Sequence, residues 1–459
     1  MNKSVVGIDL GTSAVKVLQR YQDGTVIKTK AGYDSISPEG WWKAICEALA
    51  QIELNDVAAI GLSSQVGTYI VNDKDVISWN QGAGAEEVAE VKATYSTEVF
   101  MREISMPQPA LVSYPIPRFK YIKKHFENVE RICMPKDFIC ESMTGNWVTD
   151  PYSWRGLANL ETKQYSQFFL NEVGVELSQL PKMIDYTEVA GYTKEIPMGD
   201  KVLPAGIPVY VGLNDYYASL LGMGIENAGD AFDISGTSEH LGIIEKTVCL
   251  DTKMVSGPYL NENVHYGVTN SSGASLDFGL KLHESGKVDL ASESKHNPPV
   301  FLPYLNGERA PIWDGDARGM FFGLNSDCSK EDLFYSIMEG VVFSIYHIYE
   351  SMGSPEVTFL KLAGGAAVNP ELNYLKAEMF GVRAGILEEK DTSAMGAAML
   401  AAIGLGWYAD KSEAITDICK ITDYVEPTGE YRDWLLKRFE VYKALYPAVK
   451  EQFLKLKEM

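Results

Sequence analysis

Short apolar runs alternate with amphipathic segments along most of the 459 residues. Residues 5–10 and 14–18 are mainly apolar on either side of a Gly-Thr-Ser turn, and Asp-Gly at 23–24 is typical of a hairpin. Residues 38–54 then place apolar side chains at helical spacing, and a proline stands where the first turn would begin. The chain therefore opens with strands and a helix.

The same alternation continues beyond this first helix. Residues 57–62 predict a buried strand, residues 69–77 a further hairpin, and residues 86–144 mainly helix interrupted by prolines. Hairpins followed by alternating helices and strands predict an α/β fold.

One short pattern recurs about half a chain later. Asp-Leu-Gly-Thr-Ser at residues 9–13 has a counterpart in Ile-Ser-Gly-Thr-Ser at 234–238, and each copy stands between two apolar runs. The matching context predicts two similar domains, residues 1–228 and 229–459, that face each other. A cleft between two such domains is a usual place for a ligand.

Both Gly-Thr-Ser turns are candidate phosphate sites. A tight turn between strands directs backbone N–H groups and hydroxyls at one point, which suits a phosphate. No Walker A sequence occurs. Asp9, at the end of the first strand, could hold Mg²⁺ against a nucleotide phosphate. The alternative is a plain hairpin whose aspartate caps its own backbone.

A second candidate is Asp215. The apolar run 207–212 predicts a buried strand, and a helix is predicted from Tyr216. A carboxylate between a strand end and a helix start lies where α/β folds bind ligands, and it could accept a proton from a substrate hydroxyl. The alternative is an ordinary helix N-cap.

Two further stretches are rich in small residues. Gly-Gly-Ala-Ala at 364–367 follows a predicted strand and would let a flat ring or a ribose approach the backbone, and residues 393–398 would form a second wall of that pocket. The alternative is a packing turn. Residues 301–324 are too rich in Gly, Pro and aromatics for a regular element, and their Glu308–Arg309 pair could stiffen a loop.

Charge and cysteine content exclude several classes of protein. The chain has 62 acidic and 41 basic side chains, a net charge of −21, which repels nucleic acid and anionic lipid. The 6 cysteines form no CxxC pair, which argues against a disulfide scaffold or a zinc site. We recognise neither a signal peptide nor a membrane-length apolar stretch. These features predict a soluble, cytoplasmic protein with neither nucleic-acid nor membrane partners.

Taken in order, these segments resemble the FGGY carbohydrate kinases of the actin-like ATPase superfamily. The two Gly-Thr-Ser turns resemble the family's phosphate motifs, and residues 212–215 stand where the family has its catalytic aspartate. Residues 303–324 resemble its C-terminal signature, and residues 364–367 with 393–398 resemble its adenosine motif. The resemblance extends over most of the chain.

The resemblance implies two ribonuclease-H-like domains flanking a central cleft, the sugar side in the first and the adenosine motif in the second. It implies transfer of the γ-phosphoryl group of ATP to a hydroxyl of a sugar, sugar acid or polyol, with Mg²⁺ as cofactor, and it is compatible with a homodimer. Asp215 would be the general base and Asp9 would organise the metal. The implied nucleotide contacts are Gly11, Thr12, Ser13, Lys16, Gly236, Thr237, Ser238, Gly364, Gly365, Ala366 and Asn369.

The sugar end departs from the best-known members of the family. Gln65 is followed by Val-Gly, where xylulose kinases have Met-His after the glutamine and glycerol kinases have Gln-Arg-Glu, which disfavours glycerol. Residues 79–83 read Trp-Asn-Gln-Gly-Ala and lack the Asp and Arg of the family pattern. The sugar-contact candidates are Gln65, Asn80, Gln81, Asn214 and Tyr216. Gluconate, a ketopentose, a polyol and a heptulose all stay open.

Two other functions compete with a sugar kinase. The altered sugar end would also suit a non-catalytic, nucleotide-dependent sensor or an actin-like switch ATPase. A metabolic enzyme of another class could use the same phosphate turns. A retained Asp215 argues for catalysis, because a sensor has no need of a base.

Overall fold

The computed structural model describes residues 2–107, 111–236, 238–251, 253–282 and 298–458. Contacts divide the chain into two compact units. The first holds the described parts of residues 1–226, 257–261 and 391–420, and the second holds those of residues 227–256, 262–390 and 421–459. Each unit is thus assembled from segments far apart in the sequence. The domain limits given above stay a prediction.

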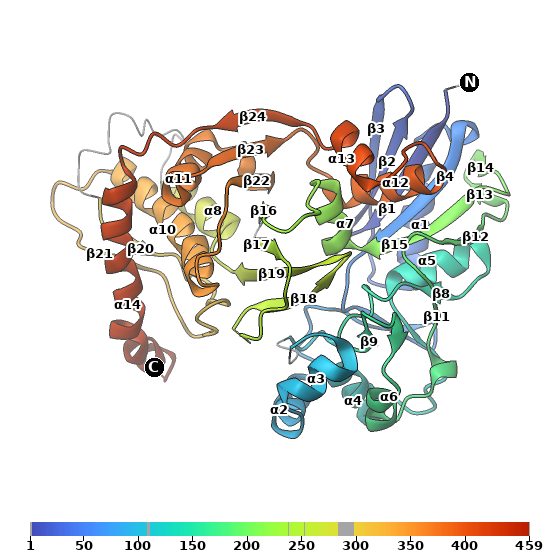
Figure 1. Ribbon diagram of the computed structural model, residues 1–459. Helices are drawn as coiled ribbons and strands as arrows, with labels where there is room; N and C mark the ends of the chain where they lie inside the picture. Colours follow the sequence, from blue (N-terminus) through green and yellow to red (C-terminus); the bar gives the residue numbers. More distant parts are fainter. Residues whose placement is uncertain (1, 108–110, 237, 252, 283–297, 459) are drawn as a thin grey trace. The chain divides into compact units, whose positions relative to one another are not determined.

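The first unit is built on a six-stranded sheet with the order β12-β15-β4-β1-β2-β3 (Figure 1). The strands are β1 Ser4–Leu10, β2 Ala14–Tyr21, β3 Val26–Gly32, β4 Val57–Ser64, β12 Val189–Tyr192 and β15 Pro208–Asn214. β1 pairs antiparallel with β2 and parallel with β4, and β15 pairs parallel with β4. The carboxyl ends of β1, β4 and β15 therefore lie at one edge of the sheet.

Helices cover both faces of this sheet. Ile8 shares a core with Trp41 of α1 (Pro38–Leu49) and Ile139 of α5 (Pro135–Thr144). Gly7, next along the strand, faces α12 (Thr392–Gly404) instead, and a Cβ at Gly7 would lie 1.9 Å from the carbonyl oxygen of Ala394. The backbone of α12 thus rests directly on the sheet.

Smaller elements complete the first unit. The helices are α2 Ala85–Thr94, α3 Thr97–Ile104, α4 Pro115–His125, α6 Gln167–Val173, α7 Asp215–Gly222 and α13 Lys411–Ile418, with the one-turn helices η1 Leu54–Asp56 and η2 Leu177–Gln179. The short strands are β5 Tyr69–Val71, β6 Asp75–Ile77, β7 Ile132–Cys133, β8 Val148–Thr149, β9 Ala158–Asn159, β10 Gln164–Tyr165, β11 Lys182–Met183, β13 Ile196–Met198 and β14 Lys201–Leu203. The hairpin predicted at 69–77 is confirmed, since β5 and β6 pair antiparallel.

The sheet of the second unit has the order β18-β19-β17-β16-β22-β23-β24 (Figure 1). Its strands are β16 Ala231–Ser235, β17 Glu239–Glu245, β18 Val255–Tyr259, β19 Glu262–Thr269, β22 Phe359–Gly364, β23 Arg383–Leu387 and β24 Ile421–Val425. β16 pairs antiparallel with β17 and parallel with β22, which repeats the arrangement of β1 with β2 and β4. The repeated strand–turn–strand pattern is therefore confirmed.

The helices of the second unit complete its core. They are α8 Gly273–Leu282, α10 Lys330–Ser351, α11 Pro370–Phe380 and α14 Arg432–Glu458, with the one-turn η3 Gly365–Val368 and the small β20–β21 pair (Val300–Leu302, Met320–Phe322). Ser329 and Asp332 form a capping box that starts α10. Mixed sheets with helices in both units confirm the α/β prediction. None of the helices in the described ranges combines the length and the apolar character that crossing a bilayer requires.

Candidate active site

Asp9 lies at the carboxyl end of β1, between two serines. Its Oδ1 accepts a hydrogen bond from Ser63 Oγ at 3.0 Å, and its Oδ2 accepts one from Ser393 Oγ at 2.6 Å. Ser63 comes from β4 and Ser393 from the first turn of α12. Burial raises the pKa of Asp9 above its usual value, and the two serine hydrogen bonds act in the opposite direction. The two hydroxyls therefore fix the orientation of this carboxylate.

The first Gly-Thr-Ser turn follows Asp9 directly. Gly11 N donates to the carbonyl of Ala14 at 3.1 Å, which closes the turn, and Thr12 and Ser13 are exposed. Lys16 stands opposite Asp9 in the β1–β2 register, and its Nζ lies 2.7 Å from Asp391 Oδ1. The turn thus presents two hydroxyls at the surface beside a lysine.

Asp215 is the first residue of α7, directly after β15. The helix is capped by the preceding residue, because Asn214 Oδ1 accepts from Tyr217 N at 3.0 Å. Asp215 is therefore not the N-cap that the alternative prediction made it. Its Oδ1 accepts from Tyr216 N at 2.8 Å. Burial, followed by the charge of Asp9, raises the pKa of Asp215 to about 7.

The backbone just before Asp215 is irregular and firmly held. β15 shifts register against β4 between Tyr210 and Leu213, and Gly212 has φ +68°, where a Cβ would lie 1.9 Å from the carbonyl oxygen of Leu62. Lys136 Nζ donates to the neighbouring carbonyl of Val211 at 3.0 Å. The strand end that carries Asp215 is therefore set by a glycine and a buried lysine.

Buried Asp150 ties this lysine to the cap of α7. Its Oδ2 lies 2.7 Å from Lys136 Nζ, and its Oδ1 accepts from Tyr152 N at 2.9 Å. The carbonyl of Tyr152 in turn accepts from Asn214 Nδ2 at 3.0 Å. Both ends of the Asn214 amide, 1% exposed, are therefore engaged within the chain.

The predicted sugar contacts differ in exposure. Gln65 is buried, its N–H donates to the carbonyl of Leu10 at 2.9 Å, and its Oε1 accepts from Thr68 Oγ1 at 3.3 Å. Asn80 and Gln81 are exposed, and Tyr216 is half-buried on α7. The structure thus places Gln65 at the strand edge that holds Asp9.

In the second unit the Gly-Thr-Ser turn joins β16 to β17. Gly236 N donates to the carbonyl of Ser238 at 2.8 Å, and Gly273 N donates to the carbonyl of Gly236 at 3.0 Å. Thr237 lies outside the described residues. Ser235 Oγ donates to the carbonyl of Ala363 at 3.0 Å, which links the turn to the end of β22.

The Gly-Glu-Arg stretch at residues 307–309 holds a loop next to this turn through hydrogen bonds. Buried Glu308 accepts hydrogen bonds from Thr269 Oγ1 and Asn270 N, both at 2.8 Å, and from Arg309 N at 2.7 Å. Asn270 belongs to the segment that leads to Gly273. Glu308 thus braces a loop, as the structural alternative for this stretch had it.

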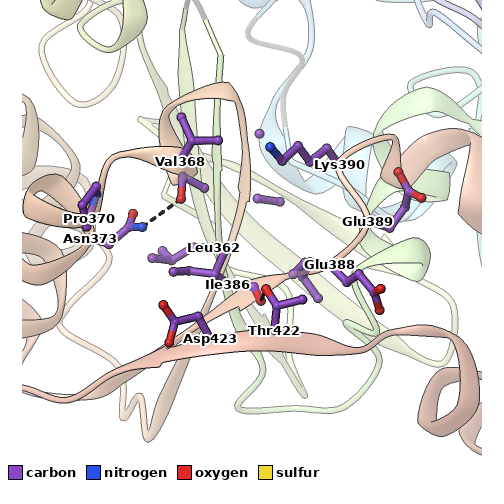
Figure 2. Close-up of a pocket in the computed structure, with 14 residues that line it drawn as sticks. Leu362, Val368, Pro370, Asn373, Ile386, Glu388, Glu389, Lys390, Thr422 and Asp423 are labelled. Atoms are coloured by element: carbon purple, nitrogen blue, oxygen red, sulfur yellow. Dashed lines mark hydrogen bonds between the residues drawn. The ribbon is translucent and has the colours of Figure 1, made fainter.

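A pocket of about 340 Å³ lies beside Gly364 (Figure 2). Its lining is Leu362, Ala363, Gly364, Ala367, Val368, Pro370, Asn373, Ile386, Leu387, Glu388, Glu389, Lys390, Thr422 and Asp423. Gly364 has φ +91°, and a Cβ there would lie 2.0 Å from the carbonyl oxygen of Ser235, so no other residue fits. Asn369 caps α11 through its Oδ1, which accepts from Leu372 N at 3.0 Å.

Residues 393–398, predicted as a second wall of this pocket, are not among the residues that line it in the second unit. They belong to α12, which is part of the first unit. Gly396 packs on α7, where a Cβ would lie 1.9 Å from the carbonyl oxygen of Ala218. Small residues signal a close backbone approach but do not say to which element.

Three kinds of comparison bear on the whole chain. Residues 4–222 match the N-terminal domain, and residues 232–405 the C-terminal domain, of the FGGY family of carbohydrate kinases. A xylulose kinase from Staphylococcus xylosus is 28% identical, with 96% of this chain and 99% of that protein covered. A glycerol kinase from Thermococcus kodakarensis is 27% identical, with 98% and 97% covered.

The crystal structure of a gluconate kinase from Lactobacillus acidophilus superposes with a TM-score of 0.86 at 22% identity, covering 99% of this chain and 100% of that one. A ligand-bound xylulose kinase from the same organism gives a TM-score of 0.85 at 22% identity, covering 99% of this chain and 100% of that one. These likenesses confirm the predicted two-domain, actin-like fold.

Proposed function

We propose an acceptor site and a general base for this chain. The chain belongs to the FGGY family of carbohydrate kinases and is a phosphotransferase with an alcohol group as acceptor. The γ-phosphoryl group of ATP is transferred to a hydroxyl of a small polyhydroxylated molecule. The acceptor oxygen bonds to the γ-phosphorus, the bond to the β–γ bridging oxygen breaks, and the hydroxyl proton passes to Asp215.

The observation that carries this proposal is the raised pKa of Asp215, together with the fixed position of its carboxyl group. A general base works best when its pKa lies near the working pH. The pKa of Asp215 is raised to about 7 by burial and by Asp9. Its carboxyl does not cap α7, because the side chain of Asn214 caps that helix. The segment before it is held by Lys136 and Gly212, so the base is positioned in advance.

The nucleotide is proposed to lie against the two Gly-Thr-Ser turns. The exposed hydroxyls of Thr12 and Ser13 and the ammonium of Lys16 suit phosphate oxygens. In the second unit, Gly236 and Ser238 supply a similar turn. The adenosine is proposed to contact Gly364, Gly365, Ala366 and Asn369 at the pocket beside β22.

Asp9 is the residue that fits a magnesium ion. Such sites usually combine one or two carboxylates with waters and substrate phosphates. The hydroxyls of Ser63 and Ser393 hold the carboxylate in one orientation next to the first phosphate turn. When bound with the nucleotide, the ion would neutralise charge on the phosphate oxygens.

We propose that the acceptor is a ketopentose of the xylulose type. Xylulose kinases from several bacteria align along 90–98% of the chain at 25–28% identity. Gln65, Asn80, Gln81 and Tyr216 would supply amide and hydroxyl groups to the sugar. Neutral groups that hydrogen-bond substrate hydroxyls discriminate strongly, because an analogue without the hydroxyl leaves them unpaired.

A coupled assay of ADP release tests this proposal. The panel is D-xylulose, D-ribulose, a heptulose, gluconate and glycerol, each with ATP and with or without Mg²⁺. We expect release to require Mg²⁺ and an acceptor, and to be fastest with D-xylulose. ATP hydrolysis indifferent to every acceptor would instead support a sensor or a switch ATPase.

A further inference from the structure

One guanidinium holds the segment Ser78–Gln81, which carries two of the proposed sugar contacts. Arg118 lies on α4, and its Nη2 donates to the carbonyl of Ser78 at 2.9 Å and to that of Gln81 at 3.0 Å. A third carbonyl, that of Trp79, lies 3.4 Å away. One nitrogen thus faces three carbonyls of the segment.

Arg118 has unusual surroundings for a buried cation. Its side chain is 0% exposed, and within the described ranges its Nε and Nη1 have no hydrogen-bond partner and no carboxylate lies at ion-pair distance. Buried Lys136, by contrast, pairs with Asp150. Burying an unpaired N–H group costs about 1–3 kcal/mol. Stability alone therefore explains poorly why a charge occupies this position.

Hydrogen bonds link residues 78–81 to a proposed acceptor contact and to a proposed phosphate contact. Trp79 N donates to Thr68 Oγ1 at 3.1 Å, and Thr68 Oγ1 donates to Gln65 Oε1 at 3.3 Å. The indole Nε1 of Trp79 donates to Thr12 Oγ1, in the first phosphate turn, at 3.2 Å. Trp79 therefore stands between the proposed acceptor glutamine and the proposed phosphate turn.

The side chains of the segment need such support. Asn80 and Gln81 are exposed, and within the segment a backbone hydrogen bond runs from Gln81 N to the carbonyl of Ser78 at 3.1 Å. Ordering an exposed loop when a ligand binds reduces affinity, so a loop fixed beforehand binds more tightly. A guanidinium that fixes three carbonyls from inside the unit does this without reaching the ligand.

We propose that Arg118 is a positioning residue for acceptor recognition: it holds the backbone of residues 78–81 so that Asn80 and Gln81 meet the acceptor in a fixed geometry. The inference rests on the proposed function, which places the acceptor at these two amides. It adds a determinant of acceptor affinity on a helix that does not itself touch the sugar.

The test compares Arg118→Met and Arg118→Lys with wild type, using the acceptor of the panel that wild type phosphorylates fastest. We expect Arg118→Met to raise KM for the acceptor about tenfold while KM for ATP changes less than about twofold. Arg118→Lys should stay within about threefold of wild type, because an ammonium offers three N–H donors to the same carbonyls. The matched control is Lys123→Met, which removes an exposed cation from the same helix.

A readout without substrate accompanies the kinetics. Hydrogen exchange of residues 78–81 should be faster in Arg118→Met than in wild type or Lys123→Met. Should methionine prevent folding, Arg118→Gln takes its place. The proposal is supported if the acceptor KM of Arg118→Met (or Arg118→Gln) exceeds that of Arg118→Lys. It is overturned if that variant keeps both the acceptor KM and the hydrogen exchange of wild type. An equal rise in KM for the acceptor and in KM for ATP also overturns it.

The variants Asn80→Ala and Gln81→Ala separate this inference from the proposed function. If both retain the wild-type acceptor KM, the acceptor site itself is wrongly placed. If either raises it while Arg118→Met does not, only the role of Arg118 is refuted.

Discussion

At the scale of single residues, the proposed site has two carboxylates in different surroundings. Asp9 is held by two hydroxyls, whereas Asp215 accepts a backbone N–H and lies within the field of Asp9. Both aspartates were predicted from their places at strand ends. Ser63 and Ser393 were not, because nothing in the sequence links residues separated by 54 and 384 positions.

The pKa of Asp215 predicts how activity depends on pH. A base must be deprotonated to accept a proton, so kcat/KM for the acceptor should rise with pH through about 7 and level off above it. Rates measured from pH 5 to pH 9 with saturating ATP check this. A profile already flat from pH 5 upward would contradict the assignment.

The same shift predicts a gain in stability when the charge is removed. The folded-state pKa is raised from 3.8 to about 7, so the folded chain binds more protons than the unfolded chain between these values, and stability falls as pH rises through this window. At pH 8, Asp215→Asn should increase the free energy of unfolding by about 1–3 kcal/mol, discounted for the partial exposure of the site. Urea unfolding at pH 8 measures it. At pH 3.5, where the aspartate is protonated in the folded chain, the difference should vanish.

At the scale of elements, hydrophobic periodicity and turn residues predicted helices and strands well, whereas runs of small residues did not predict which elements pack together. The first hairpins form as expected, and the helix predicted over residues 38–54 begins at Pro38, capped by Ser37 through Gly40 N, but ends at Leu49. The partner of the Gly/Ala-rich helix α12 could not be predicted, because its fit depends on glycines hundreds of residues away. The bulge at Gly212, which aims Asp215, was missed because an isolated glycine in a strand has several meanings.

The packing of α12 gives a prediction about stability. A Cβ at Gly61 would lie 1.9 Å from the carbonyl oxygen of Ala397, so Gly61→Ala must push the helix off the sheet. We expect the free energy of unfolding to fall by about 3 kcal/mol or more. Gly32→Ala is the matched control, since no atom lies within 4 Å of its added Cβ. Equal urea midpoints for the two variants would disprove the close packing of α12.

At the scale of the whole molecule, the duplicated strand–turn–strand pattern in the sequence corresponds to one hairpin in each unit. The pattern predicted the class of fold because a hairpin is a local structure. It did not predict that residues 391–420 join the first unit, since that depends on contacts between distant segments. The sequence left the acceptor open because Gln81 and Ala83 stand where the family pattern has an Asp and an Arg, and the amides that remain can bind the hydroxyls of many sugars.

The turnover of Asp215→Asn with the best acceptor of the panel tests the assignment of the base most directly. Asparagine keeps the size of the side chain but cannot take the proton, so kcat should fall about 10²–10⁴-fold. Calorimetry should at the same time find the affinity for ATP within about twofold of wild type, since the proposed nucleotide contacts do not include Asp215. A variant that retains the wild-type kcat would show that another group accepts the proton.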